Sequence, residues 1–581
     1  MTLIRDGIPA SPGIVIGPAY VLRWEPLRVP HVTVTPDQID GEIARFHEAR
    51  EWARERLRSI QAQTAEKLGS VEAQIFEPQI LMLDDPDLVE GTVSYIRDNL
   101  LGAARAFELR MLEYQSDWSR SGHPMVMDRM NDLLDVQIRV MRRLLGVKDI
   151  ELSFDRFEQP VVLLARDLTP SITVQLDREW ILGIGTDAGT RTSHSAILAR
   201  SLQIPAVVSL GDLSQLVQNG QQVILDGREG RVLVAPELDE VERYRERDFR
   251  IREWEQELVL LAHLQAVTPD NQHVVLRGNI DLPSEAAVVR AHGARGIGLY
   301  RTEFFVVGRS TPPEEEEQYR CYRDVTEVFP DDAVFIRTFD LGGDKFPAFL
   351  HMPPEENPFL GWRAIRVLLD MPELFRVQLR ALLRSTAHGD VRIMLPLVNE
   401  IDEIQRTREL LDEEAEKLRS EGIRFNPGYK LGAMIETPAA ALTSHELARY
   451  CDFFSIGTND LVQYTLAVDR SSSELAYLAS FFEPAVLRMI ASVVRAGADF
   501  GRPVALCGAM ASDPLAAMLL VGLGLRELSM EASAIPAVRE AIGTITLEEA
   551  EDAARAALEG ITASDVERML MDRFGERLAL E

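Results

Sequence analysis

A histidine in a polar stretch is the residue of this sequence best placed for covalent chemistry. His194 lies within residues 185–200, Gly-Thr-Asp-Ala-Gly-Thr-Arg-Thr-Ser-His-Ser-Ala-Ile-Leu-Ala-Arg, which follow the apolar run 180–184. The pattern predicts a buried strand, a glycine loop and the start of a helix. Thr192 or Ser193 can cap that helix, which leaves His194 in the first turn among unpaired N–H groups. Such a place favours a neutral imidazole before reaction and an anion after it, as a phosphoryl-accepting histidine requires. Without these neighbours, a histidine more often only caps a helix or bonds a carbonyl.

A second group of reactive side chains follows strand-like segments in the last 300 or so residues. Eight such segments alternate with helical ones, which predicts a (β/α)₈ barrel. The segments are His273–Ile280, Gly296–Phe304, Val334–Leu341, Val391–Val398, Lys430–Thr437, Phe453–Asp460, Pro503–Cys507 and Glu527–Met530. Because a barrel carries its chemistry at the carboxyl ends of its strands, we expect the polar residues that close these segments to converge.

The closing residues combine arginines with carboxylates. They are Arg301, Glu303, Arg337, Asp340, Asp344, Glu436, Asn459, Asp460 and Cys507. Together with Arg363 and Arg470, the arginines can grip oxyanions through paired N–H groups. Glu436 and Asp460 are hard oxygen ligands suited to Mg²⁺. The set predicts a site for a compact phosphate and carboxylate compound, although each residue alone could belong to a structural salt bridge.

The segment around His194 resembles the phosphohistidine motif of the phosphoenolpyruvate-utilising enzymes. That family includes Enzyme I of the phosphoenolpyruvate-dependent sugar phosphotransferase system, pyruvate phosphate dikinase and phosphoenolpyruvate synthase. Further stretches resemble Enzyme I motifs in the expected order: 298–304, 340–345, 356–364, 435–440, 453–470 and 507–508. The resemblance spans nearly the whole chain. It implies that His194 carries the phosphoryl group on Nε2, with Thr169 as the hydrogen-bond partner of the other ring nitrogen.

The resemblance also assigns roles at the barrel. It implies that phosphoenolpyruvate is contacted by Arg301, Arg337, Asn459, Asp460 and Arg470. It further implies that Glu436 and Asp460 hold Mg²⁺ and that Cys507 is the catalytic proton donor. A cysteine with a pKa near ~8.5 is mostly thiol at neutral pH and can donate a proton. Ala509 stands where the family usually has Glu, a departure that would slow this protonation if that carboxylate tunes the donor.

The expected fold is multidomain α/β. Residues 1–30 and 146–235 are assigned to a swivelling phosphohistidine α/β domain, and 31–145 to an inserted helical subdomain. Residues 236–265 are assigned to a linker helix, and 266–581 to a C-terminal TIM barrel that binds phosphoenolpyruvate. The resemblance implies that the barrel forms a homodimer. It also implies that the stretch 75–86 docks the histidine-containing phosphocarrier HPr, although an amphipathic helix of this kind is more often core plus solvent.

Composition limits the kinds of partner and the cellular compartment that the chain fits. The 581 residues carry a formal net charge of −30, which argues against nucleic acid and favours a basic protein partner. Three cysteines give no even disulfide framework, and no apolar run is long enough for a membrane insertion. We therefore expect a cytoplasmic protein.

The resemblance implies an enzyme that phosphorylates itself on His194 from phosphoenolpyruvate with Mg²⁺, releases pyruvate and passes the group to HPr for sugar uptake. The alternative is a regulatory relative, nitrogen-related or catalytically weakened, that acts mainly by binding a partner. A dikinase-type relative is disfavoured, because the residues before His194 leave no room for a nucleotide-binding domain.

Overall fold

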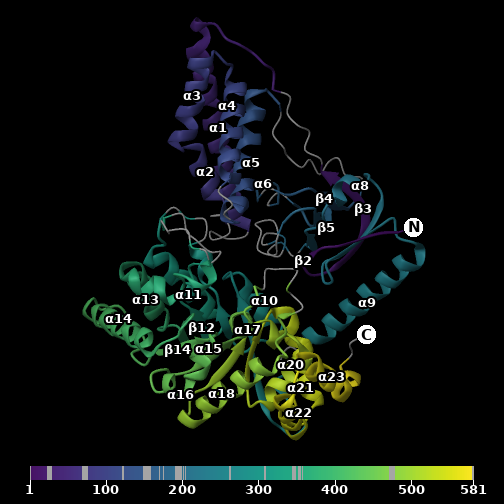
Figure 1. The fold of residues 1–581 in the computed structure, drawn as a ribbon, viewed down its shortest axis with the longest axis vertical. Helices are drawn as coiled ribbons and strands as arrows, with labels where there is room; N and C mark the ends of the chain where they lie inside the picture. Colours follow the sequence, from purple (N-terminus) through teal and green to yellow (C-terminus); the bar gives the residue numbers. More distant parts are fainter. Residues whose placement is uncertain are drawn as a thin grey trace. The chain divides into compact units, whose positions relative to one another are not determined.

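The chain divides into two units, residues 1–254 and 255–581, in the computed structural model (Figure 1). The structure describes residues 2–22, 29–67, 76–120, 124–147, 159–168, 170–173, 176–189, 196, 199, 202, 204–260, 264–306, 309, 311–342, 349–350, 355, 357–469, 475 and 478–578. No helix within these ranges is both long and apolar enough to cross a bilayer.

The scaffold of the first unit is a mixed sheet with the strand order β1-β8-β7-β3-β4-β5-β6-β2. Its strands are β1 (Leu3–Asp6), β2 (Ile8–Ser11), β3 (Ile14–Leu22), β4 (Val161–Ala165), β5 (Ile181–Thr186), β6 (Ala206–Val208), β7 (Gln222–Asp226) and β8 (Arg231–Val234). Strands β3 to β6 are parallel and the outer pairings are antiparallel. All five residues of β4 are buried, and they alternate between two apolar clusters. Both faces of the sheet are therefore covered, as a run of Val and Leu without polar alternation indicates.

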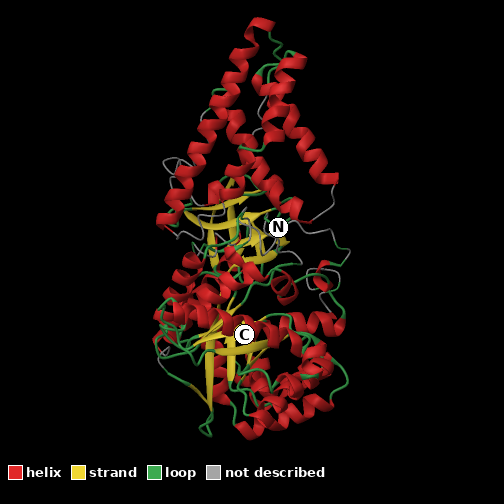
Figure 2. Cartoon of the chain, turned by 90° about the vertical axis from the view of Figure 1, so that its left-hand side faces the viewer, coloured by secondary structure: helices red, strands yellow, loops and turns green. Residues whose placement is uncertain are grey.

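A bundle of long helices lies between β3 and β4 in the sequence. Its helices are α1 (Ile39–Lys67), α2 (Glu77–Leu83), α3 (Pro86–Asn99), α4 (Ala103–Arg120) and α5 (Pro124–Leu144), drawn in red in Figure 2. Their facing sides share one core that includes Phe46, Leu57, Phe107 and Val140. The helical insertion predicted from the glycine-poor, Leu- and Ala-rich composition is thus present.

Helix α9 (Leu238–Leu260) follows β8. The part of this helix up to Ile251 packs against the sheet, because Val241, Tyr244 and Ile251 contact an apolar cluster that includes Ile14. Arg247 also pairs with the buried carboxylate of Asp226 at 3.0 Å. This part of the helix is therefore held in place by the first unit.

The second unit contains a closed parallel barrel. Its strands are β10 (His273–Ile280), β11 (Ile297–Tyr300), β12 (Val334–Arg337), β13 (Val391–Leu395), β14 (Lys430–Ile435), β15 (Phe454–Gly457), β16 (Val504–Cys507) and β17 (Glu527–Met530). Each pairs in parallel with the next, and β10 pairs with both β11 and β17, which closes the ring. The short strand β9 (Ala266–Val267) pairs antiparallel with β10. The predicted (β/α)₈ barrel is confirmed, with several strands shorter than the sequence segments suggested.

Helices surround the barrel strands. They are α10 (Glu285–Ala291), α11 (Glu315–Val328), α12 (Ile365–Asp370), α13 (Pro372–Ser385), α14 (Ile401–Ser420), α15 (Pro438–Leu442), α16 (Ser444–Leu447), α17 (Thr458–Leu466), α18 (Pro484–Phe500), α19 (Ala509–Ser512), α20 (Pro514–Gly522), α21 (Ile535–Thr544), α22 (Leu547–Glu559) and α23 (Ala563–Phe574). A buried apolar cluster that includes Phe335, Met394, Met434 and Cys507 joins strands β12, β13, β14 and β16 of the barrel. Side chains, not solvent, thus fill the space between these strands, which fixes the residues at the strand ends.

Candidate functional site

Four predicted site residues lie at or just beyond the carboxyl ends of barrel strands. Arg337 ends β12, Glu436 follows β14, Asp460 lies in the first turn after β15, and Cys507 ends β16. All four are buried, with exposed fractions of 4%, 1%, 6% and 1% in that order. A charged side chain this deeply buried is stable only when it is paired or hydrogen-bonded, so the contacts of each residue determine which of its atoms can bind a ligand.

Arg337 is the positive centre of this cluster. Its Nη2 donates to Glu303 Oε1 at 2.8 Å and lies 3.3 Å from Asp340 Oδ2. The Nε atom is buried and has no hydrogen-bond partner among the described residues, and Nη1 contacts only the sulfur of Met434. Glu303 and Asp340 therefore fix one edge of the guanidinium and leave N–H groups for a bound anion.

Arg363 is used differently from what the sequence suggested. Its Nε and Nη2 donate to the two carboxylate oxygens of Asp340 at 2.8 and 2.9 Å, and Nη1 donates to Tyr464 Oη at 2.8 Å. Nη2 also lies 3.5 Å from Asp460 Oδ2. Nearly all donors of this guanidinium are thus engaged inside the protein, so we interpret Arg363 as the residue that holds Asp340 and Asp460 in place.

Glu436 and Asp460 form the oxygen pair expected to bind a metal ion. Glu436 Oε1 accepts the Leu397 N–H at 2.6 Å, and Asp460 Oδ1 is buried without a hydrogen-bond partner among the described residues. Burial, and then the charge of Asp460, raise the pKa of Glu436 to about 8. A carboxyl group whose ionisation is opposed by burial and by a neighbouring carboxylate that has an unused buried oxygen fits a hard divalent cation.

The described residues contain no group of three or more His, Cys, Asp or Glu that could hold a metal by themselves. A cation at Glu436 and Asp460 would therefore take its remaining ligands from water and substrate, as Mg²⁺ commonly does.

Cys507 lies in an apolar setting. Ser455 Oγ donates to its sulfur at 3.6 Å, and the thiol faces Ile456 O at 3.6 Å. Burial is the main reason that the pKa of this thiol is raised, so it stays protonated at neutral pH. The charges acting on it include Glu436 and Arg301, which places the thiol beside the charged cluster.

The turn after Cys507 needs a glycine. Gly508 has a φ of +114°, and a Cβ there would lie 2.5 Å from Thr458 Oγ1. Asn459 Oδ1 accepts the Ala509 N–H at 3.0 Å, so this asparagine ties the turn to the start of α17. Ala509, the first residue of α19, is exposed.

Arg301 lies at a more open position than the other residues. Its side chain is 31% exposed, and Nη1 donates to Asp281 Oδ1 at 2.8 Å. A guanidinium with one edge paired and partial access to solvent can bind an entering anion.

His194, Thr169, Asp344 and Arg470 lie outside the described residues. The strands that lead to the first two are described, and they run side by side. Parallel strands β4 and β5 pair along their length, and beyond them Asp187 N donates to Ala165 O and Ala188 N to Arg166 O, both at 3.0 Å. The chain segments leading to Thr169 and His194 therefore leave the sheet next to each other.

Two side chains, the half-buried Tyr464 and the buried Gln378, escaped the sequence reasoning. Tyr464 joins Arg363 to Phe359 O, and Gln378 donates to Thr302 Oγ1 while accepting the Phe339 N–H. Tyr464 is four residues after Asp460 on α17, so helical spacing could have shown that both lie on one face.

The stretch 75–86 is largely engaged within the helical bundle. Phe76 and Leu83 are core residues, Asp84 pairs with Arg54, and Asp85 caps α3 through the Asp87 N–H. Leu81 is 42% exposed and is the apolar residue of this stretch that remains available to a partner.

Comparisons with known proteins agree across the chain. Residues 6–129, 157–230 and 255–547 match the models for the PEP-utilising enzyme N-terminal region, mobile domain and PEP-binding domain. The chain is 42% identical to the phosphoenolpyruvate-protein phosphotransferase of Geobacillus stearothermophilus, over 94% of this chain and 93% of the relative. It is 38% identical to that of Haemophilus influenzae over 97% and 98%, and 39% identical to that of Staphylococcus aureus over 97% and 98%. The chain therefore belongs to the family of PEP-utilising enzymes.

Proposed function

We propose that this chain is a phosphoenolpyruvate–protein phosphotransferase, the Enzyme I of a sugar phosphotransferase system. It takes the phosphoryl group of phosphoenolpyruvate onto His194, releases pyruvate and passes the group to a phosphocarrier protein. The observation that carries the proposal is the buried cluster of Arg337, Glu436, Asp460 and Cys507 at one end of a closed barrel. Similarity to enzymes of this name over nearly the full length does not favour the regulatory alternative.

Phosphoenolpyruvate binds at the carboxyl ends of the barrel strands. Arg337 offers its unused N–H groups to the substrate's oxyanions, and the partly exposed Arg301 adds charge. We also assign Arg470 to the substrate, on the resemblance of its segment to the family motif. The Asn459 side chain fixes the turn after Cys507 and so shapes the wall of the site. Guanidinium groups held in advance by carboxylates stabilise charge on the transferring group without reorganising.

The divalent cation of this site is Mg²⁺, held by Glu436 and Asp460. When bound, it supplies positive charge that offsets the oxyanions of the phosphoryl group. Asp340 does not ligate it, because Arg363 occupies both of its carboxylate oxygens.

Cys507 supplies the proton that completes pyruvate. Transfer of the phosphoryl group to the imidazole of His194 breaks the phosphate–oxygen bond and leaves the enolate of pyruvate. The Cys507 sulfur gives its proton to the methylene carbon of that enolate, and the thiolate then regains a proton from solvent. A buried thiol that stays protonated at neutral pH suits this role.

The partner is HPr, which docks on the helical subdomain with the exposed Leu81 in the contact. The barrel forms the homodimer. We assign the protein to the cytoplasm, which agrees with Cys321, Cys451 and Cys507 forming no disulfide bond.

The test is incubation with ³²P-labelled phosphoenolpyruvate and Mg²⁺. The wild type is expected to become labelled on histidine and to release one pyruvate per label, whereas His194→Ala stays unlabelled. His273→Ala, which changes an exposed histidine at the start of β10, serves as the matched control and labels normally. Labelling of His194→Ala to the wild-type extent would refute the assignment.

A further inference from the structure

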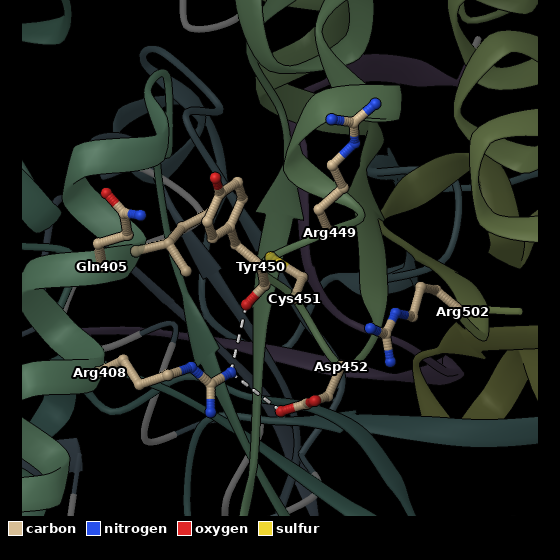
Figure 3. A pocket seen from close by; sticks show the side chains of 8 residues that line it. Gln405, Arg408, Arg449, Tyr450, Cys451, Asp452 and Arg502 are labelled. Carbon is tan, nitrogen blue, oxygen red and sulfur yellow. Dashed lines mark hydrogen bonds and ion pairs between the residues drawn. The ribbon is translucent and has the colours of Figure 1, made fainter. Parts of the chain in front are cut away.

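A second pocket lies against the barrel at the amino-terminal ends of its strands (Figure 3). Its volume is about 280 Å³, at the small end for ligand pockets. The lining residues are Ile404, Gln405, Arg408, Arg449, Tyr450, Cys451, Asp452 and Arg502. A space of this size holds a single small molecule.

The pocket is separate from the cluster described above. Asp452 comes two residues before β15 begins, and Arg502 comes two residues before β16. Glu436, Asp460 and Cys507 lie at or beyond the other ends of β14, β15 and β16. Because these strands are parallel, the two sites lie at opposite ends of the barrel.

Positive charge exceeds negative charge among the lining residues. They include three arginines and one carboxylate, Asp452, which Arg408 Nη2 contacts at 3.1 Å and to which Leu431 N donates at 2.8 Å. Cys451 adds no charge, because burial raises the pKa of its thiol to about 12. Asp452 therefore balances the charge of Arg408, and no lining carboxylate balances the charges of Arg449 and Arg502.

The two remaining arginines are anchored at sites that leave N–H groups available. Arg502 Nε donates to Ala448 O at 3.1 Å, which fixes the plane of its guanidinium. The Arg449 guanidinium lies over the Phe500 ring at 5.7 Å from its centroid. Neither forms an ion pair with a carboxylate in the part of the chain that the structure describes. Both can still donate to a ligand.

We propose that this pocket binds a small phosphate-bearing anion. Guanidinium N–H groups match the oxygens of a tetrahedral dianion in pairs, and the pocket is lined by three arginines that come from two loops and one helix. A chain with a net charge of −30 repels anions in general, so an anion binds only where positive charge is concentrated. Residues at the amino-terminal ends of barrel strands usually contribute to stability alone. A cavity lined by three arginines at that end therefore points to a binding site separate from the one at the carboxyl ends.

The test is equilibrium dialysis of the full chain with ³²P-labelled inorganic phosphate in the presence of a chelator. Arg337→Gln removes anion binding at the carboxyl ends of the strands, and on this background we expect one phosphate per chain. Adding Arg449→Gln or Arg502→Gln is expected to weaken that binding by about tenfold or more, the loss of a charge-assisted contact. Arg573→Gln removes one exposed positive charge that does not line the pocket and is expected to change it little.

The melting temperature of each variant shows whether its fold is intact. The conservative variant Arg502→Lys separates loss of the binding site from loss of the fold. Arg502→Lys keeps the charge and is expected to retain part of the binding. The proposal is overturned if Arg337→Gln alone abolishes phosphate binding, or if Arg449→Gln and Arg502→Gln bind phosphate like their parent. Displacement of bound phosphate by succinate at equal concentration would replace the phosphate assignment with a dicarboxylate.

Discussion

Gly457→Ala tests the position of Glu436 without replacing that residue. Gly457 is the last residue of β15, and a Cβ there would lie 2.8 Å from Glu436 Oε2 and 3.0 Å from Glu436 Cβ. Ordinary contact begins at 3.4 Å, so the carboxylate must move by roughly 0.6 Å or the strands must part. The backbone angles of Gly457, φ −91° and ψ 85°, are open to alanine, so the effect is steric.

The expected size of the effect follows from these distances. Metal–ligand distances tolerate shifts of about 0.2 Å, so a displacement of roughly 0.6 Å exceeds what the cation can accept. We expect the affinity for Mn²⁺, used as a paramagnetic substitute for Mg²⁺, to fall by about 10–100-fold. Overpacking should cost about 1–3 kcal/mol of unfolding free energy.

Mn²⁺ binding is measured by electron paramagnetic resonance, stability by urea unfolding, and activity as pyruvate formed. Gly543→Ala is the matched control, since nothing lies within 4 Å of its added Cβ and the residue is in α21. It should bind Mn²⁺ normally and gain about 0.5–1 kcal/mol in stability. If Gly457→Ala binds Mn²⁺ as tightly as the wild type, Glu436 is not the metal ligand inferred from the geometry.

Three further predictions concern the same end of the barrel. Cys507→Ser should still become phosphorylated on His194 but release pyruvate about 10²–10⁴-fold more slowly, because a hydroxyl is a weaker acid than a thiol. Equal single-turnover rates of pyruvate formation in Cys507→Ser and the wild type would exclude the thiol as the proton donor. Arg363→Lys should lose about 1.5–3 kcal/mol of unfolding free energy, since lysine cannot reproduce both bonds to Asp340, whereas the exposed change Arg555→Lys should cost less than about 0.5 kcal/mol. The fold raises the pKa of Glu436 from 4.5 to about 8, so its contribution to the stability of the metal-free protein is full below pH 4.5 and is lost progressively between pH 4.5 and 8. With a chelator present, the melting temperature of Glu436→Gln relative to the wild type should therefore be higher at pH 9 than at pH 6, and an unchanged difference would count against the raised pKa.

The sequence predicted the barrel well because the strand segments are short apolar runs closed by polar residues. The polar residues that close the runs could be read directly, and the ring geometry places Arg337, Glu436 and Cys507 at one end of the barrel. Strand ends were less certain: the segment 296–304 ends as a strand at Tyr300 and continues as a short 3₁₀ turn, because Glu303 turns inward to accept from Arg337.

Contacts between distant segments could not be predicted in this way. Arg363 was expected to grip an anion, but its partner Asp340 is 23 residues away, and only the fold brings the Nε and Nη2 groups onto that carboxylate. The pocket beside Arg502 also depends on two loops and a helix that no local pattern connects. Residue type predicted that these side chains are charged, and packing determined which of the charges remain available to a ligand.

The balance of buried charge gives an independent reason for a divalent cation. Among the described residues of the cluster, Arg337 and Arg363 face four carboxylates, those of Glu303, Asp340, Glu436 and Asp460, and all six side chains are buried. Two positive charges against four negative ones leave a deficit of two, which a proton on Glu436 removes in part and a divalent cation removes in full. The charge of phosphoenolpyruvate must then be met by the N–H groups of Arg337 that its carboxylate partners leave unused and by arginines outside this cluster. Arg301 is such an outside residue, since its side chain is 31% exposed and its partner Asp281 is 43% exposed. Because Arg301 forms no ion pair with Glu436 or Asp460 among the described residues, Arg301→Gln should weaken phosphoenolpyruvate binding and leave Mn²⁺ affinity nearly unchanged, and a parallel loss of both would contradict this assignment.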